Sequence, residues 1–193
     1  MKKLLILAVV AALSFWGCSE STSLTEPTDA QSNQSFLKVN SNVEVSELSA
    51  EAKSVLGVED VNTLSKSWLQ SSTGKLIGED GGNIGFFLGY NGALTLGNLD
   101  IAANQFEVGT PVAVAMVPGA AAVDITPDKN PIDAQLTVCF LGVDLPESGV
   151  DFVYIQADGS LGTVVYDRIL VGDGWAVVVK AQLGHFSRFG FTK

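Results

Sequence analysis

The sequence predicts an all-β fold, an antiparallel β-sandwich, and two observations carry that prediction. From about Trp68 onward, short runs rich in Val, Ile, Phe and Thr are separated by Gly, Asn, Asp and Pro, as is typical of many short strands. Asn-Gly or Asp-Gly also stands between apolar runs, and these dipeptides favour the type I′ turns of hairpins. No long helical period interrupts the series, which argues against alternating strands and helices and against nucleotide-binding folds.

The turn residues divide this region into strands. Asn-Gly at 91–92 and Asp-Gly at 158–159 predict two-residue hairpin turns, and Asp-Gly at 80–81 and 173–174 predicts related turns. Strands are therefore expected near residues 82–90, 93–97, 111–117, 121–126, 133–141, 150–157, 160–170, 174–181 and 185–192.

Alternation along these strands assigns side chains to faces. Phe140 should face one side of its sheet and Cys139 the other. Lys180 should share a face with Ala176 and point away from Trp175. Two antiparallel sheets of this kind close most naturally as an Ig-like β-sandwich.

A short helix is predicted ahead of the strands. Apolar residues recur at helical spacing over 48–56, with Ser49 as a candidate N-cap and Gly57 as a candidate stop. We therefore expect residues 46–75 to hold a short helix and a lead-in strand, and residues 76–193 to form the sandwich domain.

The first residues have the order of a secretory signal peptide. Lys2 and Lys3 precede an apolar run, Leu4–Trp16, which is followed by the small residue Gly17. As a helix, this run of about 13 residues would reach about 20 Å, against about 30 Å for a bilayer core. It is too short for a membrane span, so a signal peptide over residues 1–17 is predicted.

The Gly17-Cys18 pair resembles the lipobox of bacterial lipoproteins, in which the cysteine is acylated and becomes the new N-terminus. Phe15 departs from the pattern, because the lipobox usually has Leu at that position. The resemblance implies lipid attachment at Cys18 and a membrane contact through that lipid, with an ordinary cleaved signal peptide as the alternative. Ser19 replaces the Asp that retains many lipoproteins in the inner membrane, which favours the outer membrane of a bacterial cell envelope, on its periplasmic or its surface side.

A polar stretch follows the cysteine. Residues 19–42 are rich in Ser, Thr, Asn, Gln and acids, and they have too few large apolar groups to offset the entropy of ordering. A disordered tether is therefore expected over residues 18–45. As a flexible coil, residues 19–42 would span roughly 27 Å from end to end.

Charge and cysteine content exclude some classes of function. The formal net charge is −10, and it becomes −12 once residues 1–17 are removed, because that segment holds two lysines and no acid. A chain this acidic is not expected to bind nucleic acid, because the phosphates of nucleic acid are bound by patches of Lys and Arg. If Cys18 carries lipid, Cys139 is left without a disulfide partner and is expected to be a buried structural thiol.

His185 is the only histidine, and Ser187 lies two residues away, so a small envelope hydrolase is the alternative class of function. A serine hydrolase needs a nucleophile on an exposed, strained turn, an orienting acid and an oxyanion hole. The chain has no G-x-S-x-G sequence, and Ser187 falls within an expected strand. We therefore expect a structural histidine, no catalytic set and no cofactor.

The segment Asp124–Asp133 gathers Asp124, Asp128, Asn130 and Asp133 around two prolines. Calcium takes six to eight oxygen ligands, so a calcium-stabilised adhesion module is a further alternative. Because the spacing matches no defined calcium loop, a solvated acidic loop is expected and no metal site is assigned.

Several aromatic residues lie in or beside the expected strands, where most should belong to the core. Exposed together on one face, they would instead form a platform for a protein or glycan ligand. They are Phe86, Phe87, Tyr90, Phe152, Tyr154 and Trp175.

The closing run His185–Phe189 resembles the last strand of a β-sandwich module that occurs in bacterial surface lipoproteins and is related to that of ankyrins, netrin receptors and tight-junction scaffold proteins. Gly81–Ile84 resembles the opening strand of that module, and the resemblance covers residues 76–193. The family usually has a Pro-x-Gly-Ala corner where this chain has Gly97–Asp100. Since members of that family are mostly non-catalytic, the resemblance implies binding, adhesion or envelope structure.

Overall fold

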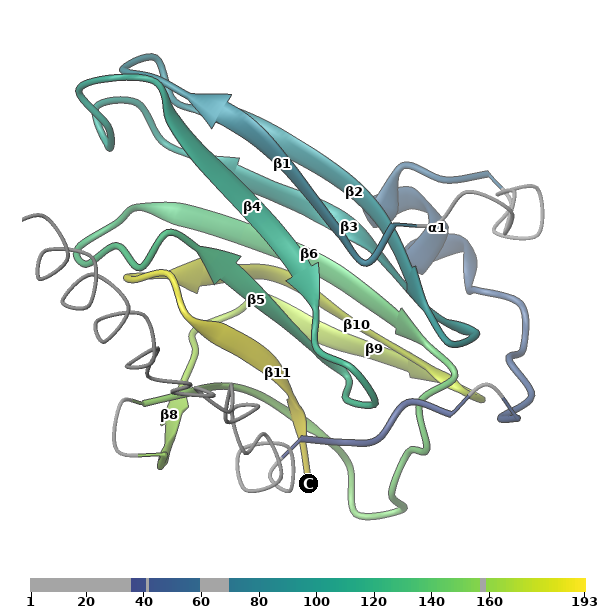
Figure 1. The fold of residues 1–193 in the computed structure, drawn as a ribbon. Helices are drawn as coiled ribbons and strands as arrows, with labels where there is room; N and C mark the ends of the chain where they lie inside the picture. Colours follow the sequence, from purple (N-terminus) through teal and green to yellow (C-terminus); the bar gives the residue numbers. More distant parts are fainter. Residues whose placement is uncertain (1–35, 41, 60–69, 157–158) are drawn as a thin grey trace, which may run out of the picture.

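The computed structural model describes residues 36–40, 42–59, 70–156 and 159–193. In these residues, eleven antiparallel strands form two sheets that pack face to face, so the chain is an all-β sandwich, as predicted (Figure 1). The predicted signal peptide, Cys18 and most of the expected tether lie outside the described residues.

The two sheets have six and five strands. In the six-stranded sheet the order is β1-β4-β5-β11-β7-β8, and in the five-stranded sheet it is β2-β3-β6-β10-β9. The elements are α1 (Ala50–Leu56), β1 (Ser72–Ile77), β2 (Gly82–Tyr90), β3 (Ala93–Ile101), β4 (Thr110–Met116), β5 (Ala122–Thr126), β6 (Ala134–Leu141), β7 (Asp151–Ile155), β8 (Leu161–Thr163), β9 (Arg168–Gly172), β10 (Trp175–Leu183) and β11 (Arg188–Thr192).

Several strand predictions need correction. The run expected over 160–170 is two strands, because β8 pairs with β7 in one sheet and β9 with β10 in the other. The strand expected over 185–192 begins only at Arg188, and β3 continues to Ile101 rather than ending at residue 97. The turn at 91–92 is confirmed by positive φ at both residues, 49° at Asn91 and 84° at Gly92.

The inner faces of both sheets share one core. Phe140 of β6 meets Phe191 of β11 edge to face, with ring centroids 5.8 Å apart, and Phe152 of β7 meets Phe191 at 5.2 Å. All three rings are fully buried. Edge-to-face pairs of this kind add to the free energy gained by burying the rings.

A β-bulge in β10 keeps that core apolar. Lys180 was expected on the same face as Ala176, which the structure shows to be the inner one, but it has φ 51° and is exposed. Its backbone N–H donates to Oγ1 of Thr137 at 3.1 Å. The inserted residue shifts the alternation by one position, so Ala181 and Leu183 point into the core again.

Helix α1 covers part of the outer face of the five-stranded sheet. Ser49 caps it, because the Ser49 hydroxyl accepts from the N–H of Ala52 at 3.1 Å, and Gly57 ends it at φ 67°, both as predicted. Beneath it lies a second apolar cluster with Cys139 and Trp175. Burial raises the pKa of the Cys139 thiol, which keeps it protonated. Within the described ranges, no helix has the length and apolar character needed to cross a membrane.

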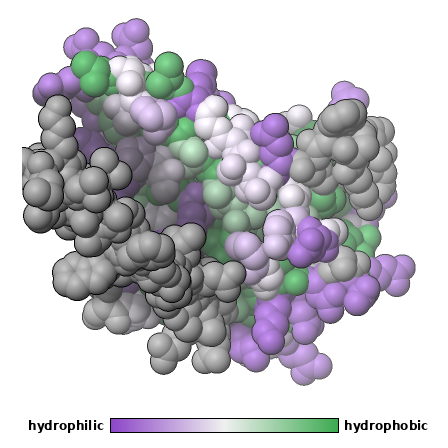
Figure 2. Space-filling model, in the orientation of Figure 1, coloured by the Kyte–Doolittle hydropathy of each residue, from purple (hydrophilic) through white to green (hydrophobic). Residues whose placement is uncertain are grey.

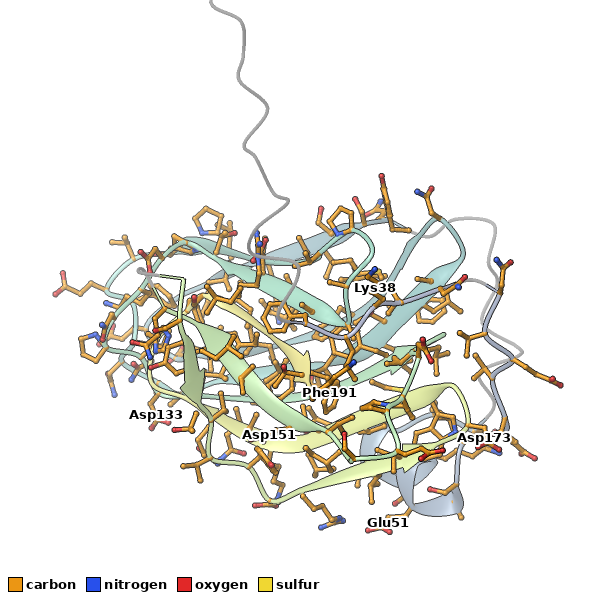
Figure 3. The ribbon with its side chains drawn as sticks, turned by 90° about the horizontal axis from the view of Figure 1, so that it is seen from below. Lys38, Glu51, Asp133, Asp151, Asp173 and Phe191 are labelled. Carbon is orange, nitrogen blue, oxygen red and sulfur yellow. The ribbon has the colours of Figure 1, made fainter. Side chains whose placement is uncertain are left out.

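Residues 36–40 and 42–46 close one end of the sandwich, although the sequence predicted a disordered tether up to residue 45. Phe36 and Leu37 are buried, and the N–H of Leu37 donates to the carbonyl of Phe191 at 2.7 Å. Further along, the N–H of Ser46 donates to the carbonyl of Asp173 at 2.9 Å. In Figure 3, Asp173 lies at one end of the molecule and Asp133 at the other. Residues 36–40 and 42–45, which the sequence assigned to the tether, therefore belong to the folded domain.

The outer face of the six-stranded sheet carries small and apolar side chains along β1 and β4. Leu76 is exposed, and Ala113 and Ala115 of β4 are half-buried. Figure 2 shows weakly hydrophilic to hydrophobic residues across the middle of this face, with most of the strongly hydrophilic ones at its margins. Further along the face, Phe36 packs in a small apolar cluster with Ala122.

Three aromatic side chains lie directly opposite a glycine on the neighbouring strand. The pairs are Phe86 with Gly97, Tyr154 with Gly162, and Trp175 with Gly172. A Cβ added to the glycine would lie 2.8, 2.2 and 2.4 Å from the respective ring. Each ring therefore occupies the space that a side chain on its partner would need, so these positions require glycine.

Replacing Gly97 with alanine should destabilise the domain. The new Cβ would lie 2.2 Å from the carbonyl oxygen of Thr137 and 2.8 Å from Cζ of Phe86, so a backbone or a ring must move. We expect a loss of about 1–3 kcal/mol in the free energy of unfolding, measured by urea denaturation. Gly85→Ala is the matched control, because Gly85 of β2 has no neighbour within 4 Å, and it should change stability by less than about 1 kcal/mol. Equal stability of the two variants would contradict the close packing at Gly97.

Candidate functional site

A hollow of about 680 Å³ opens where β5 and β7 end and β11 begins. It lies at the end of the sandwich away from the segment 36–46, whose hydrogen bonds go to Phe191 near the end of β11 and to the β9–β10 turn. The hollow is lined by Asp124, Ile125, Thr126, Asp128, Asn130, Tyr154, Ile155, Gln156, His185, Phe186, Ser187 and Arg188.

One wall of the hollow is the link between β10 and β11, residues 184–187, through which the chain passes from one sheet to the other. Phe186 of this link is fully buried, and its N–H donates to the carbonyl of Lys129 at 2.8 Å. On either side, the N–H of Ile132 donates to the carbonyl of Gly184, and that of Ile125 to the carbonyl of Ser187, both at 3.0 Å. Main-chain bonds therefore fix the positions of His185 and Ser187.

His185 is half-buried within an aromatic cluster. Its ring meets Tyr154 edge to face, with centroids 4.3 Å apart at an angle of 74°, and lies 5.7 Å from the ring of Phe189. Neither the His185 imidazole nor the Tyr154 hydroxyl hydrogen-bonds to any residue in the described part of the chain. Both groups border the hollow, so both are available to a ligand there.

Ser187 does not have the surroundings of a nucleophile. Its hydroxyl donates to the carbonyl oxygen of Ile155 at 3.1 Å, and it has no hydrogen bond to His185. The two residues proposed for hydrolysis thus border the same hollow without forming a nucleophile–base pair. The Ser187 hydroxyl instead ties the β10–β11 link to the end of β7.

Asp124 and Arg188 form a two-pronged ion pair beside the hollow. Nε of Arg188 lies 2.7 Å from Oδ1 of Asp124, and Nη2 lies 3.0 Å from Oδ2. The pair arises because the two residues are directly opposite each other in β5 and β11. This arrangement fixes both side chains and neutralises their charges. The sequence had placed Asp124 in an acidic segment and gave no sign of its partner.

The acidic segment 124–133 is only partly gathered at the hollow. Asp128 and Asn130 border it with Asp124, whereas Asp133 lies elsewhere and its N–H donates to the Gln105 side chain at 2.9 Å. Among the residues that the structure describes, no group of three or more His, Cys, Asp or Glu side chains is placed to hold a metal ion. The geometry therefore adds nothing in favour of the calcium alternative.

The aromatic residues do not form a common platform. Phe86, Phe152 and Trp175 are buried, and the indole N–H of Trp175 donates to the hydroxyl of Ser46 at 3.1 Å. Tyr90 is exposed on the five-stranded sheet, whereas Tyr154 borders the hollow on the other sheet. Most of these rings are core, as expected, and Tyr154 alone contributes to the candidate site.

Comparisons with known proteins give no match to a family model, to a curated protein or to a solved structure. The resemblances to bacterial lipoproteins and to the sandwich module of ankyrins stay predictions from the sequence. Function is therefore argued from the residues themselves.

Outside the hollow, the hydroxyl of the partly exposed Tyr166 has a raised pKa. Its hydroxyl donates to Oδ1 of Asp151 at 2.7 Å. Partial burial, reinforced by this hydrogen bond and by the nearby negative charge of Asp151, raises the pKa of Tyr166 to about 12 from an ordinary value of 10. All three causes oppose formation of the tyrosinate.

This tyrosine should make stability depend on pH at alkaline values. Because the folded state holds the proton more tightly than the unfolded state, its contribution is complete below pH 10 and is lost as the pH rises towards 12. Tyrosinate absorbance should show one of the three tyrosines titrating near pH 12, and Tyr166→Phe should remove that component. Asp151→Asn should lower its pKa. A Tyr166 component that ionises at pH 10 in the folded protein would contradict the geometry.

Proposed function

We propose that this chain is a lipid-anchored protein of a bacterial cell envelope, and that its β-sandwich serves in binding, adhesion or envelope structure rather than in catalysis. The observation that carries the anchor is Gly17-Cys18, directly after the basic and apolar segments of a signal peptide. Ser19 after the cysteine favours the outer membrane.

The physical chemistry of acylation makes such an anchor stable. Each methylene buried in the bilayer contributes about 0.8 kcal/mol, so several acyl chains on one residue hold a protein at the membrane almost permanently. The polar residues between Cys18 and the domain then set the distance from the headgroups. A function that depends on a fixed position suits a protein with this organisation.

The joint between tether and domain supports an anchored function. Leu37 is buried, donates to the carbonyl of Phe191, and accepts at its own carbonyl from the N–H of Ala121, both at 2.7 Å. It therefore bonds to β11 and to the residue just before β5, in the interior of the six-stranded sheet. A force transmitted through a tether attached here would act on hydrogen-bonded strands of the domain and not on an unpaired terminal segment.

The chemistry of the hollow supports binding over turnover. The Ser187 hydroxyl is engaged with a main-chain carbonyl, and Arg188 is paired with Asp124. Polar groups without a partner in the described part of the chain, placed around an open hollow, suit recognition of a ligand, whereas acyl transfer requires a nucleophile next to its base.

Lipidation at Cys18 is tested by metabolic labelling with an acyl-chain analogue. Cys18→Ser should lose the label and move from the membrane fraction to the soluble fraction, with an unchanged melting temperature. Cys139→Ala is the matched control, because it removes the only other cysteine, which is buried, and should keep the label. Labelling that survives Cys18→Ser would disprove the assignment of the lipid to this residue.

A further inference from the structure

The hollow presents polar groups that have no hydrogen-bond partner among the residues that the structure describes. The His185 imidazole and the Tyr154 hydroxyl are half-buried at its wall without hydrogen bonds to described residues. Half-buried groups have lost part of their hydration, so a ligand that pairs with them gains more than it would at a fully exposed site.

Amide side chains add both donors and acceptors at the rim. Asn130 lies in the loop after β5 and Gln156 directly follows β7, and both side chains border the hollow without a partner among the described residues. An amide donates two hydrogen bonds and accepts through its oxygen. Hydroxyl groups of a ligand, which also donate and accept, match this mixture better than a purely anionic or cationic group does.

Tyr154 supplies a fixed apolar surface beside these groups. Its ring covers Gly162 of β8 and is held edge to face by His185. A ring immobilised in this way loses little entropy on binding, and its body is apolar while its hydroxyl is polar. A ligand with an apolar face and polar edges, such as a sugar ring, matches that combination.

Charge excludes the main competing ligands. The guanidinium of Arg188 is neutralised by Asp124, and among the described residues that line the hollow the remaining carboxylate is that of Asp128. In a chain of net charge −10, this hollow shows no unpaired Lys or Arg among its described lining residues to attract a phosphate or an acidic glycan. A cation would need several carboxylate ligands together, and no such cluster occurs among the described side chains.

We propose that this hollow is a binding site for a neutral carbohydrate, a chain of one or a few sugar rings. Its volume of about 680 Å³ falls within the range of about 300–1,000 Å³ typical of small-molecule sites. The proposal rests on the proposed function, because it names the ligand of a domain that binds rather than catalyses. It also places the ligand at the end of the sandwich away from the joint with the tether.

The single histidine makes a direct test practical. Because His185 is the only one in the chain, its ring C–H groups give unique NMR signals that report on the hollow without further assignment. The mature, full-length protein in a sugar-free zwitterionic detergent is titrated with glucose, galactose, mannose, N-acetylglucosamine and their β1,4-linked disaccharides. We expect a saturable shift of the His185 signals with at least one sugar at millimolar concentration.

Substitutions at the rim connect the shift to the hollow. Asn130→Ala and Gln156→Ala each remove hydrogen-bonding atoms from exposed positions, so each should weaken sugar binding about two- to tenfold with an unchanged melting temperature. Gln135→Ala is the matched control, because Gln135 is an exposed amide on β6 outside the hollow, and it should leave the affinity unchanged.

The outcomes separate this proposal from the proposed function. No shift with any of these sugars at tens of millimolar overturns it, as does a shift with calcium chloride or sodium phosphate alone. Equal affinities in Asn130→Ala, Gln156→Ala and the control also overturn it. Because the titration does not depend on the acyl chain, labelling at Cys18 without a sugar response refutes the carbohydrate site alone, and a sugar response without labelling refutes the anchor alone.

Discussion

The passage of the chain from β10 to β11 determines both the closure of the sandwich and the shape of the hollow. Within four residues, 184–187, the chain leaves one sheet and enters the other. Phe186 fills the space between the sheets at this point and is fully buried. Since the main chain on both sides bonds to the loop before β6 and to β5, the side chains that flank Phe186 have little freedom.

Strand β11 joins two parts of the six-stranded sheet that are otherwise unconnected. It pairs with β5 over Arg188–Gly190 and with β7 over Phe189–Thr192. The hollow lies across this junction, because Asp124 comes from β5 and Tyr154 from β7. A ligand bound there contacts both parts, so the site exists only once the last strand of the chain has been inserted.

The sequence predicted the elements that depend on local chemistry. The Ser49 cap, the Gly57 stop and the turn at 91–92 were predicted because each rests on the conformational preferences of adjacent residues. The split of 160–170 into β8 and β9 was missed, because an apolar strand pattern does not say which sheet a strand joins. The bulge at Lys180 was missed for a related reason, because it depends on a hydrogen bond to the side chain of Thr137 on a neighbouring strand.

The site illustrates the same limit. His185 and Ser187 were singled out by type and spacing, but the partner of the Ser187 hydroxyl is Ile155, a carbonyl that no motif marks. Arg188 and Asp124 meet only because β5 and β11 become neighbours in the fold. Phe36 and Leu37 were assigned to a polar stretch by composition, yet both are buried by strands that follow much later in the chain.

The two ends of the sandwich are therefore built in different ways, and this difference has a physical consequence. At the end near Asp173, main-chain hydrogen bonds of residues 36–40 and 42–46 and the buried side chain of Leu37 close the opening. At the other end, Phe186 seals the core beneath the surface, and the polar groups above it stay open to solvent. In the anchored protein that we propose, force at the anchor would act on paired strands of the core at the closed end. The proposed ligand would bind at the open end, away from the contacts that close the other end.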